Sequence, residues 1–204
     1  MELKLKYLKE KFIEKRFLIL MGITIVCSLI STKITYIASK YIHSTFNIPP
    51  VVKDLIWEHL PYLPILWVSE VLMLLSALYL LIWSFKKNKY YLPYAILIIS
   101  IFHLFRAFLI VLTPLGFPYE YNGILYNSNK SVLMYGAFPS GHLSIPLLAY
   151  LITKKNLALL LTFLVGITLL ISRGHYSIDL VGTILLIYPI YKFSENYLKK
   201  YFIK

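Results

Sequence analysis

The fold of this chain is decided by segments such as LPYAILIISIFHLFRAFLIVL, residues 92–112, which contains a single charged side chain, Arg106. A helix needs about 20 apolar residues to cross the hydrocarbon core of a bilayer, which is about 30 Å thick. The segment meets that length, so we predict that it spans a membrane.

Five further apolar segments accompany it, and the composition agrees with this reading. Of the 204 residues, 59% are hydrophobic and the mean hydropathy is +0.71, whereas a soluble domain averages about 45–50% apolar residues. We therefore predict an all-α integral membrane protein, a polytopic bundle of six transmembrane helices. It forms a single membrane-embedded domain over residues 1–204, with no room for a separate soluble domain. The predicted spans are residues 17–42, 64–85, 92–112, 139–153, 157–171 and 176–193.

The formal net charge is +12, and the positions of the cations indicate topology rather than a nucleic-acid partner. Fifteen of the 21 cations lie in the two terminal segments, at the C-terminal end of the sixth span, and in the connections after the second and fourth spans. Because cytoplasmic loops are enriched in Lys and Arg, we expect both termini and these two connections in the cytoplasm. The fifteen are Lys4, Lys6, Lys9, Lys11, Lys15, Arg16, Lys86, Lys87, Lys89, Lys154, Lys155, Lys192, Lys199, Lys200 and Lys204. The other six are Lys33, Lys40, Lys53, Arg106, Lys130 and Arg173.

A polar motif, SRGHYSID at residues 172–179, interrupts the apolar sequence before the last span. If that span begins near Gly174, His175 and Asp179 lie four residues apart on one helix face. A carboxylate beside an imidazole fixes its tautomer and raises its basicity, which leaves the other ring nitrogen as a nucleophile. Arg173 offers a forked pair of donors to phosphoryl oxygens. His175 and Asp179 are therefore candidate catalytic residues.

A second motif, PSGH at residues 139–142, opens the fourth predicted span. Ser140 and Gly141 place backbone N–H groups at a helix N-terminus, which attracts phosphate. His142 can act there as a general acid and later as a general base. Neither motif decides the function alone, since an isolated Ser-Gly-His is common and an Arg at a helix mouth is often an interfacial anchor. Both motifs fall on the outer side with Arg106, and ionisable groups in a bilayer are usually functional.

At these motifs the sequence resembles the type 2 phosphatidic acid phosphatase superfamily of integral-membrane lipid phosphatases and lipid phosphotransferases, over residues 100–185. The resemblance implies a six-helix core in which a histidine attacks phosphorus to give a phosphohistidine intermediate. It implies that His175 is the nucleophile, Asp179 its partner and His142 the acid. The implied phosphate-binding set, in which we include the Arg of the third span, is Arg173, Ser140, Gly141 and Arg106.

Two departures from the usual phosphatase pattern point to a particular branch. That pattern has a Lys seven residues before the first-motif Arg, where this chain has Ile99, and five residues between Arg and His, where it has Gly174 alone. The short form is similar to that of the sphingomyelin and inositol phosphoceramide synthases. Two looser matches agree: Thr113-Pro114-Leu115 after Arg106, and Pro49-Pro50 with Asp54 ahead of Ser69-Glu70. Against this branch, residues 134–139 read MYGAFP, whereas those synthases have Cys-Gly-Asp shortly before Ser-Gly-His.

The lengths of the fourth and fifth spans bear on the substrate. At 1.5 Å per residue, about 15 residues reach only about 22 Å, against a core of about 30 Å. Their outer ends are expected to be recessed, which suits a phosphate whose acyl or prenyl tail stays in the bilayer. Glu70 lies in the second span, where an unpaired carboxylate is expensive. It either pairs with Arg106, which we favour, or assists His142 in proton transfer.

The sequence therefore predicts an enzyme, a lipid phosphatase that cleaves a lipid phosphate ester at the outer face of the cell membrane and passes the phosphoryl group to water. The alternative is a lipid phosphotransferase that moves a phospho-headgroup to the hydroxyl of a lipid alcohol. A second alternative is a non-catalytic lipid-binding or scrambling protein, against which the intact His142, His175 and Asp179 argue. No metal or cofactor is expected, since no His, Cys or carboxylate cluster has ligand spacing.

Overall fold

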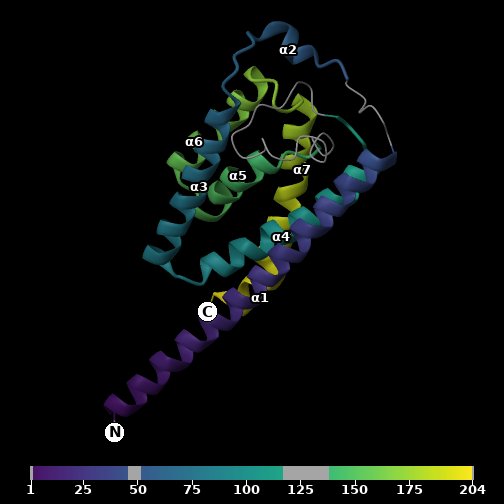
Figure 1. Cartoon of the computed structure of the whole chain (residues 1–204). Helices are drawn as coiled ribbons and strands as arrows, with labels where there is room; N and C mark the ends of the chain where they lie inside the picture. Colours follow the sequence, from purple (N-terminus) through teal and green to yellow (C-terminus); the bar gives the residue numbers. More distant parts are fainter. Residues whose placement is uncertain (1, 46–51, 117–137, 204) are drawn as a thin grey trace.

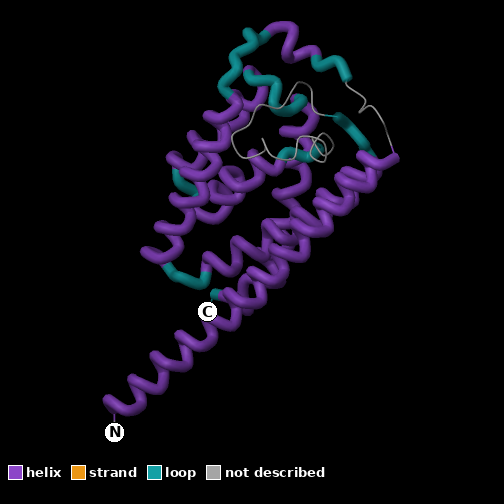
Figure 2. The backbone as a smooth tube through the Cα atoms, in the orientation of Figure 1, coloured by secondary structure: helices purple, strands orange, loops and turns teal. Residues whose placement is uncertain are grey.

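A computed structural model describes residues 2–45, 52–116 and 138–203, with their side chains except those of residues 2–13 and His43. The regular structure in these ranges is helical (Figures 1 and 2), which confirms the predicted all-α class. Pro49, Pro50, Lys130 and residues 134–137, used in the sequence argument, lie outside the described residues. The elements are α1 (Glu2–Thr45), α2 (Leu55–His59), α3 (Leu66–Lys87), α4 (Tyr91–Leu112), α5 (Gly141–Thr153), α6 (Asn156–Ile171), α7 (Ser177–Phe193), a π-helical turn η1 (Ser194–Leu198) and α8 (Lys199–Phe202).

Among the described residues, four helical stretches are long and apolar enough to cross a membrane. The other two predicted spans correspond to α5 and α6, which have 13 and 16 residues. At 1.5 Å per residue these reach about 20 and 24 Å. The five predicted spans after the first agree with observed helices to within two residues at each boundary. The four long stretches are Glu14–Ile42, Leu66–Lys87, Tyr91–Leu112 and Ser177–Phe202.

Local capping explains where the shorter helices begin and end. Ser140 caps α5 by accepting a hydrogen bond from the Leu143 N–H, and Lys154 ends α5 in the left-handed conformation with φ 53°. Only Lys154 and Lys155 separate α5 from α6, so these helices form a tight antiparallel pair. Asp54 caps α2 by accepting from the Ile56 N–H.

Helix α1 is much longer than the predicted first span. It has 44 residues, which corresponds to about 66 Å at 1.5 Å per residue. Its lysine-rich beginning is helical rather than a loop, and this end projects beyond the rest of the molecule (Figure 1). The apolar part of α1 lies along α4.

Small and hydroxyl-bearing side chains form the side of α1 that faces α4. Thr35 donates a hydrogen bond to the carbonyl of His103 on α4, at 3.0 Å, and Ala38 packs against Ala107 and Ile110 in a buried cluster. Small residues allow two helix backbones to approach closely in a membrane. The buried residues of this α1 stripe are Thr24, Ser31, Thr35, Ala38, Ser39 and Ile42.

The remaining helices form one bundle (Figure 1). Helices α3, α5 and α6 pack against one another, and α7 lies between α5 and α4. A large core joins α4, α5 and α7 and contains Tyr94, Phe102, Leu148 and Ile187. A second core joins α3, α5, α6 and α7: Leu66, Leu143, Val165, Leu169 and Leu180. Because Leu143 follows His142 and Leu180 follows Asp179, the second core fixes the helix ends that bear the two motifs.

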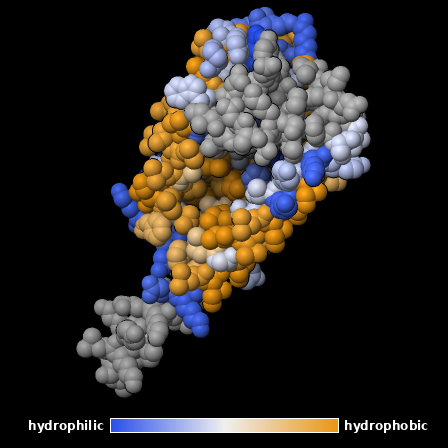
Figure 3. Space-filling view, in the orientation of Figure 1, coloured by the Kyte–Doolittle hydropathy of each residue, from blue (hydrophilic) through white to orange (hydrophobic). Residues whose placement is uncertain are grey.

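The outside of the bundle is apolar. Large hydrophobic side chains such as Leu74, Leu78 and Leu185 are 50–69% exposed, and Figure 3 shows hydrophobic residues over most of the visible flank. Hydrophilic residues gather near α2 at one end. Because soluble monomers rarely expose contiguous apolar patches of more than a few hundred Å², this surface indicates a membrane protein.

The α1–α4 contact yields a testable prediction. Ala38→Leu inserts three carbon atoms between two closely packed helices, and overpacking of this kind costs about 1–3 kcal/mol. We expect a lower thermal unfolding midpoint for the purified protein in detergent, measured by tryptophan fluorescence. Ile37→Leu, at a neighbouring side chain that is 54% exposed, serves as the control and leaves the midpoint unchanged. Equal midpoints for both variants would contradict the packing of α1 on α4.

Candidate active site

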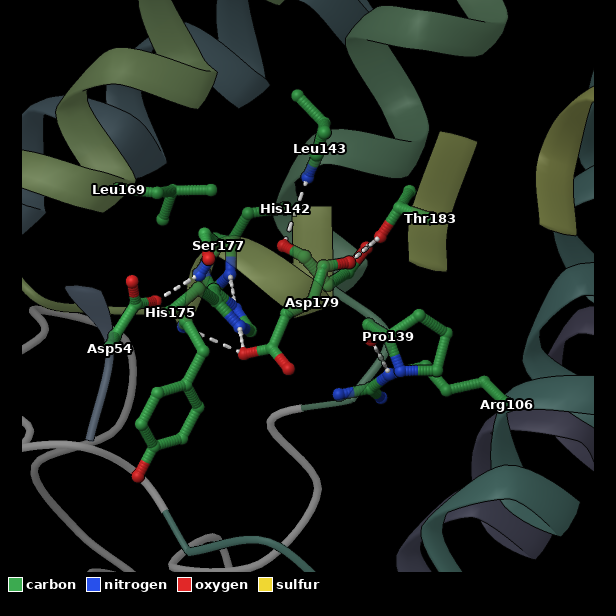
Figure 4. Close-up of polar contacts among 12 residues, drawn as sticks. Asp54, Arg106, Pro139, His142, Leu143, Leu169, His175, Ser177, Asp179 and Thr183 are labelled. Carbon is green, nitrogen blue, oxygen red and sulfur yellow. Dashed lines mark hydrogen bonds and ion pairs between the residues drawn. The ribbon is translucent and has the colours of Figure 1, made fainter. Parts of the chain in front are cut away.

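The two sequence motifs meet at the N-terminal ends of α5 and α7 (Figure 4). Thr183, one turn after Asp179, donates from its hydroxyl to the backbone carbonyls of Ser140, at 3.0 Å, and Asp179, at 2.8 Å. The Ser140 N–H also donates to the Asp179 carbonyl, at 3.3 Å. Two of these hydrogen bonds, Thr183 to Ser140 and Ser140 to Asp179, tie the start of α5 to the N-terminal turns of α7. Histidines 33 positions apart therefore share one site.

His142, His175 and Asp179 form a buried chain of hydrogen-bonding groups. The Nδ1 of His142 lies 3.4 Å from the Nε2 of His175, and the Nδ1 of His175 lies 3.0 Å from the Oδ2 of Asp179. The three residues are 8, 1 and 0% exposed, respectively. A carboxylate accepts only from a protonated nitrogen, so Asp179 places a proton on Nδ1 of His175. The Nε2 of His175, which faces His142, then carries the free lone pair of the ring.

The pairing of His175 with Asp179 arises differently from the sequence expectation. Helix α7 begins at Ser177 with Tyr176 as its N-cap residue, so His175 precedes the helix instead of sharing a face with Asp179. Asp179 reaches back from the first turn, and its Oδ2 accepts from the Tyr176 N–H at 2.9 Å as well as from His175. This reciprocal capping brings the carboxylate to the imidazole.

Arg106 reaches the same site from α4. Its Nε donates to the carbonyl of Pro139 at 2.8 Å, and its guanidinium carbon lies 3.8 Å from where a Cβ of Gly141 would stand. The guanidinium therefore lies beside the first turn of α5, where backbone N–H groups already favour an anion. The structure thus brings Arg106 together with Ser140, Gly141 and His142.

Arg173 lies on the same loop as His175 but reaches a different neighbour. Its backbone is in the left-handed region, with φ 52°, and its N–H donates to the Leu170 carbonyl at the end of α6. Its guanidinium carbon lies 5.3 Å from the centroid of the Tyr62 ring. Arg173 is one of the seven predicted site residues. Its contact with Tyr62 places its side chain against the segment that precedes α3.

Several residues outside the seven predicted site residues support the site. Asp54 accepts a hydrogen bond from the Ser177 N–H at the start of α7, and Thr183 ties α7 to α5 as described above. Thr183 follows Asp179 by four residues. Because this spacing places both on one helix face, it could have indicated that Thr183 belongs to the site. Glu70 is 2% exposed, in α3.

Two glycines allow close approaches at the site. A Cβ on Gly182 of α7 would lie 2.4 Å from a ring carbon of Phe138, the residue before Pro139. A Cβ on Gly174 would lie 2.3 Å from the Cδ1 of Leu66. The spacing between α7 and the residues that precede α5 therefore depends on the absence of a side chain at position 182.

No group of three or more His, Cys, Asp or Glu residues in the described part of the chain is arranged to hold a metal ion. The sequence matches no protein-family model and no curated protein. The site is therefore interpreted from its own geometry and from the motifs.

Gly182→Ala tests the packing at the site. The added methyl group must displace the Phe138 ring, at an expected cost of about 1–3 kcal/mol. We expect a lower unfolding midpoint. Gly166→Ala is the matched control, because its Cβ would meet its nearest neighbour, Leu143, at 3.9 Å, an ordinary contact. If Gly182→Ala were as stable as Gly166→Ala, the close approach of Phe138 to α7 would be wrong.

Proposed function

We propose that this protein is an integral-membrane lipid phosphatase that cleaves a lipid phosphate ester through a phosphohistidine at His175. The observation that supports this most directly is the chain His142–His175–Asp179, with its distances of 3.4 and 3.0 Å. It combines an oriented nucleophile with a second imidazole beside the attacking nitrogen. The resemblance of both motifs to the type 2 phosphatidic acid phosphatase superfamily supports the same reaction.

In the first step, the lone pair of His175 Nε2 attacks phosphorus and the ester P–O bond breaks. The departing alkoxide takes a proton from His142 and leaves as an alcohol. The Asp179 carboxylate, held 3.0 Å from Nδ1, stabilises the positive charge that develops on the His175 ring. The products of this step are a free lipid alcohol and phosphohistidine.

In the second step, His142 accepts a proton from water while the water oxygen attacks the phosphorus of phosphohistidine. The N–P bond breaks, its electron pair returns to Nε2, and inorganic phosphate leaves. Both histidines then have their starting protonation. The same imidazole thus serves as acid and then as base, as microscopic reversibility requires.

Phosphoryl oxygens gain negative charge during both steps, and the site offers donors for them. Arg106 and the first-turn N–H groups of α5 lie on one side of the two histidines, and Arg173 is two residues before His175 in the chain. Such preorganised donors stabilise developing charge. The two facing nitrogens, 3.4 Å apart, must separate when a phosphoryl group enters between them.

The proposed arrangement in the membrane has six spans, both termini in the cytoplasm and the site on the outer side of the cell membrane. Supporting it, the lysine-rich α3–α4 connection and the C-terminus lie toward one end of the molecule and α2 at the other (Figure 1). The short α5 and α6 would leave the site below the outer surface. A lipid phosphate could then reach it while its tail stays in the bilayer.

The second candidate is a phosphotransferase in which a lipid alcohol replaces water in the second step. The single residue between Arg173 and His175 favours it, as in the synthase branch. The deep burial of His175, 1% exposed, also limits access of bulk water. Both candidates share the first covalent step.

Replacing His175 tests the mechanism. In liposomes with lipid phosphates, headgroup-bearing phospholipids and a lipid alcohol, His175→Ala should abolish both turnover and an acid-labile phosphoenzyme, because no nucleophile remains. His142→Ala should lower turnover by about 10²–10⁴-fold, the usual contribution of a general acid or base. Phosphate release and lipid mass spectrometry measure the products.

His59→Ala, at an exposed residue of α2, is the control and keeps full activity. Free phosphate that depends on His175 supports the phosphatase, and a new headgroup-bearing lipid supports the transferase. Normal turnover by His175→Ala would exclude the mechanism, and no product from the unaltered protein would favour a non-catalytic role.

Cysteine labelling tests the proposed orientation. Cys27 is the one cysteine of the sequence, so Cys27→Ala provides a background without thiols. In it, Lys53→Cys, at a side chain that is 75% exposed, should react with an impermeant maleimide on intact cells. Lys87→Cys at the end of α3 should react only after lysis. The reverse pattern would overturn the topology.

A further inference from the structure

The segment between α1 and α3 is fastened to the loop that bears His175. The Leu63 N–H donates to the Ile171 carbonyl at the end of α6, at 2.9 Å. The Trp57 ring stacks on Tyr176, with centroids 4.9 Å apart and planes 21° from parallel. The Tyr176 hydroxyl accepts from the Val52 N–H at 3.3 Å. Residues 52–63 therefore contact the His175 loop on both sides of the histidine.

Asp54 forms the polar centre of this attachment. Its Oδ1 accepts from the Ile56 N–H at 3.0 Å, which caps α2, and its Oδ2 accepts from the Ser177 N–H, the first residue of α7. The side chain is 7% exposed. One buried carboxylate thus joins the starts of two helices (Figure 4).

Two carboxylates accept hydrogen bonds from backbone N–H groups at the start of α7, each from a different residue. Asp179 uses one oxygen, Oδ2, for both the Tyr176 N–H and the His175 Nδ1. Asp54 takes the next N–H, that of Ser177. Both negative charges also suit the positive end of the helix dipole. Because the Ser177 N–H donates to Asp54, it does not compete for the Asp179 oxygen that orients His175.

We propose that Asp54 is a positioning residue for the reaction at His175. By holding the Ser177 N–H it fixes the first turn of α7, and through that turn it fixes Asp179 and the direction of the His175 Nε2. Without Asp54, the partly buried Ser177 N–H loses its acceptor. The carboxylate of Asp179, two residues further along the same turn, is then the nearest alternative acceptor in the sequence. This inference rests on the proposed function.

The test compares Asp54→Ala and Asp54→Asn with Glu58→Ala in the full-length protein. Glu58 belongs to the same segment and forms an exposed ion pair with Lys53 at 2.6 Å, so its removal controls for general disturbance of residues 52–63. For each variant, kcat and KM per folded protein are measured in liposomes. The rate at which diethyl pyrocarbonate modifies His175 is followed by peptide mass spectrometry.

We expect Asp54→Ala to lower kcat by about 10- to 100-fold, the range that corresponds to loss of a hydrogen bond to a charged group. KM should stay within about threefold, because the hydrogen bonds described for Asp54 go to the backbone of Ile56 and Ser177. His175 should be modified faster as its loop loosens. Asp54→Asn keeps one acceptor oxygen and should fall between Asp54→Ala and the unaltered protein. Glu58→Ala should match the unaltered protein in every measurement.

A pure capping role would lower the unfolding midpoint without changing kcat per folded protein or the modification rate of His175. That result overturns the proposal. If Asp54→Ala does not fold, the same two measurements on Asp54→Asn decide. If the unaltered protein has no activity, the proposed function fails, and the modification rates alone decide whether Asp54 positions His175: unchanged rates overturn the proposal and faster modification supports it.

Discussion

The arrangement of the site depends on the carboxylate of Asp179, which is fully buried at the start of α7. A buried charge is costly unless hydrogen bonds stabilise it, and here a single oxygen accepts from both the Tyr176 N–H and His175. This requirement fixes where α7 begins, since the carboxylate must reach back over the N-cap. It also places the carbonyl of Asp179 where Ser140 and Thr183 can donate to it. The capping by Asp179 thus contributes to the docking of α5 on α7, together with the hydrogen bond from Thr183 to the Ser140 carbonyl.

Most of the fold could be predicted from the sequence because polar residues interrupt the apolar runs and mark where the helices begin and end. Helices α3 to α7 begin and end close to the predicted boundaries, where Lys, Asn or Ser interrupts the apolar runs. The beginning of α1 was missed because its alternating Lys and Leu residues read as a polar flank, although both residue types favour helices. Helix α2 was missed because five residues give no periodic signal. Its cap, Asp54, depends on the turn it starts, which is visible only in three dimensions.

The site residues that could be predicted are those that belong to the two short sequence motifs. His175 and Asp179 belong to one motif, and His142 was joined to them by the second motif and by topology. Their contact follows from capping rather than from a shared helix face, which spacing alone could not distinguish. Asp54 and Ser177 lie 123 residues apart, and Tyr62 and Arg173 come from the same two segments. Such pairs depend on how the connection between α1 and α3 folds over the bundle, and no local pattern encodes that path.

The packing of α1 on α4 has a consequence for biogenesis. During synthesis α1 is made before α4, and the whole of α2 and α3 lies between them in the sequence. Until α4 is made, the hydroxyl stripe of α1 faces lipid without its final neighbour. The stripe tolerates this interval because its hydroxyls bond within the helix: Thr24 to the Leu20 carbonyl, Ser31 to that of Ser28 and Thr35 to that of Ser31. A helix whose hydroxyls are satisfied internally can be stable before its partner is made, so the order of translation need not match the order of assembly.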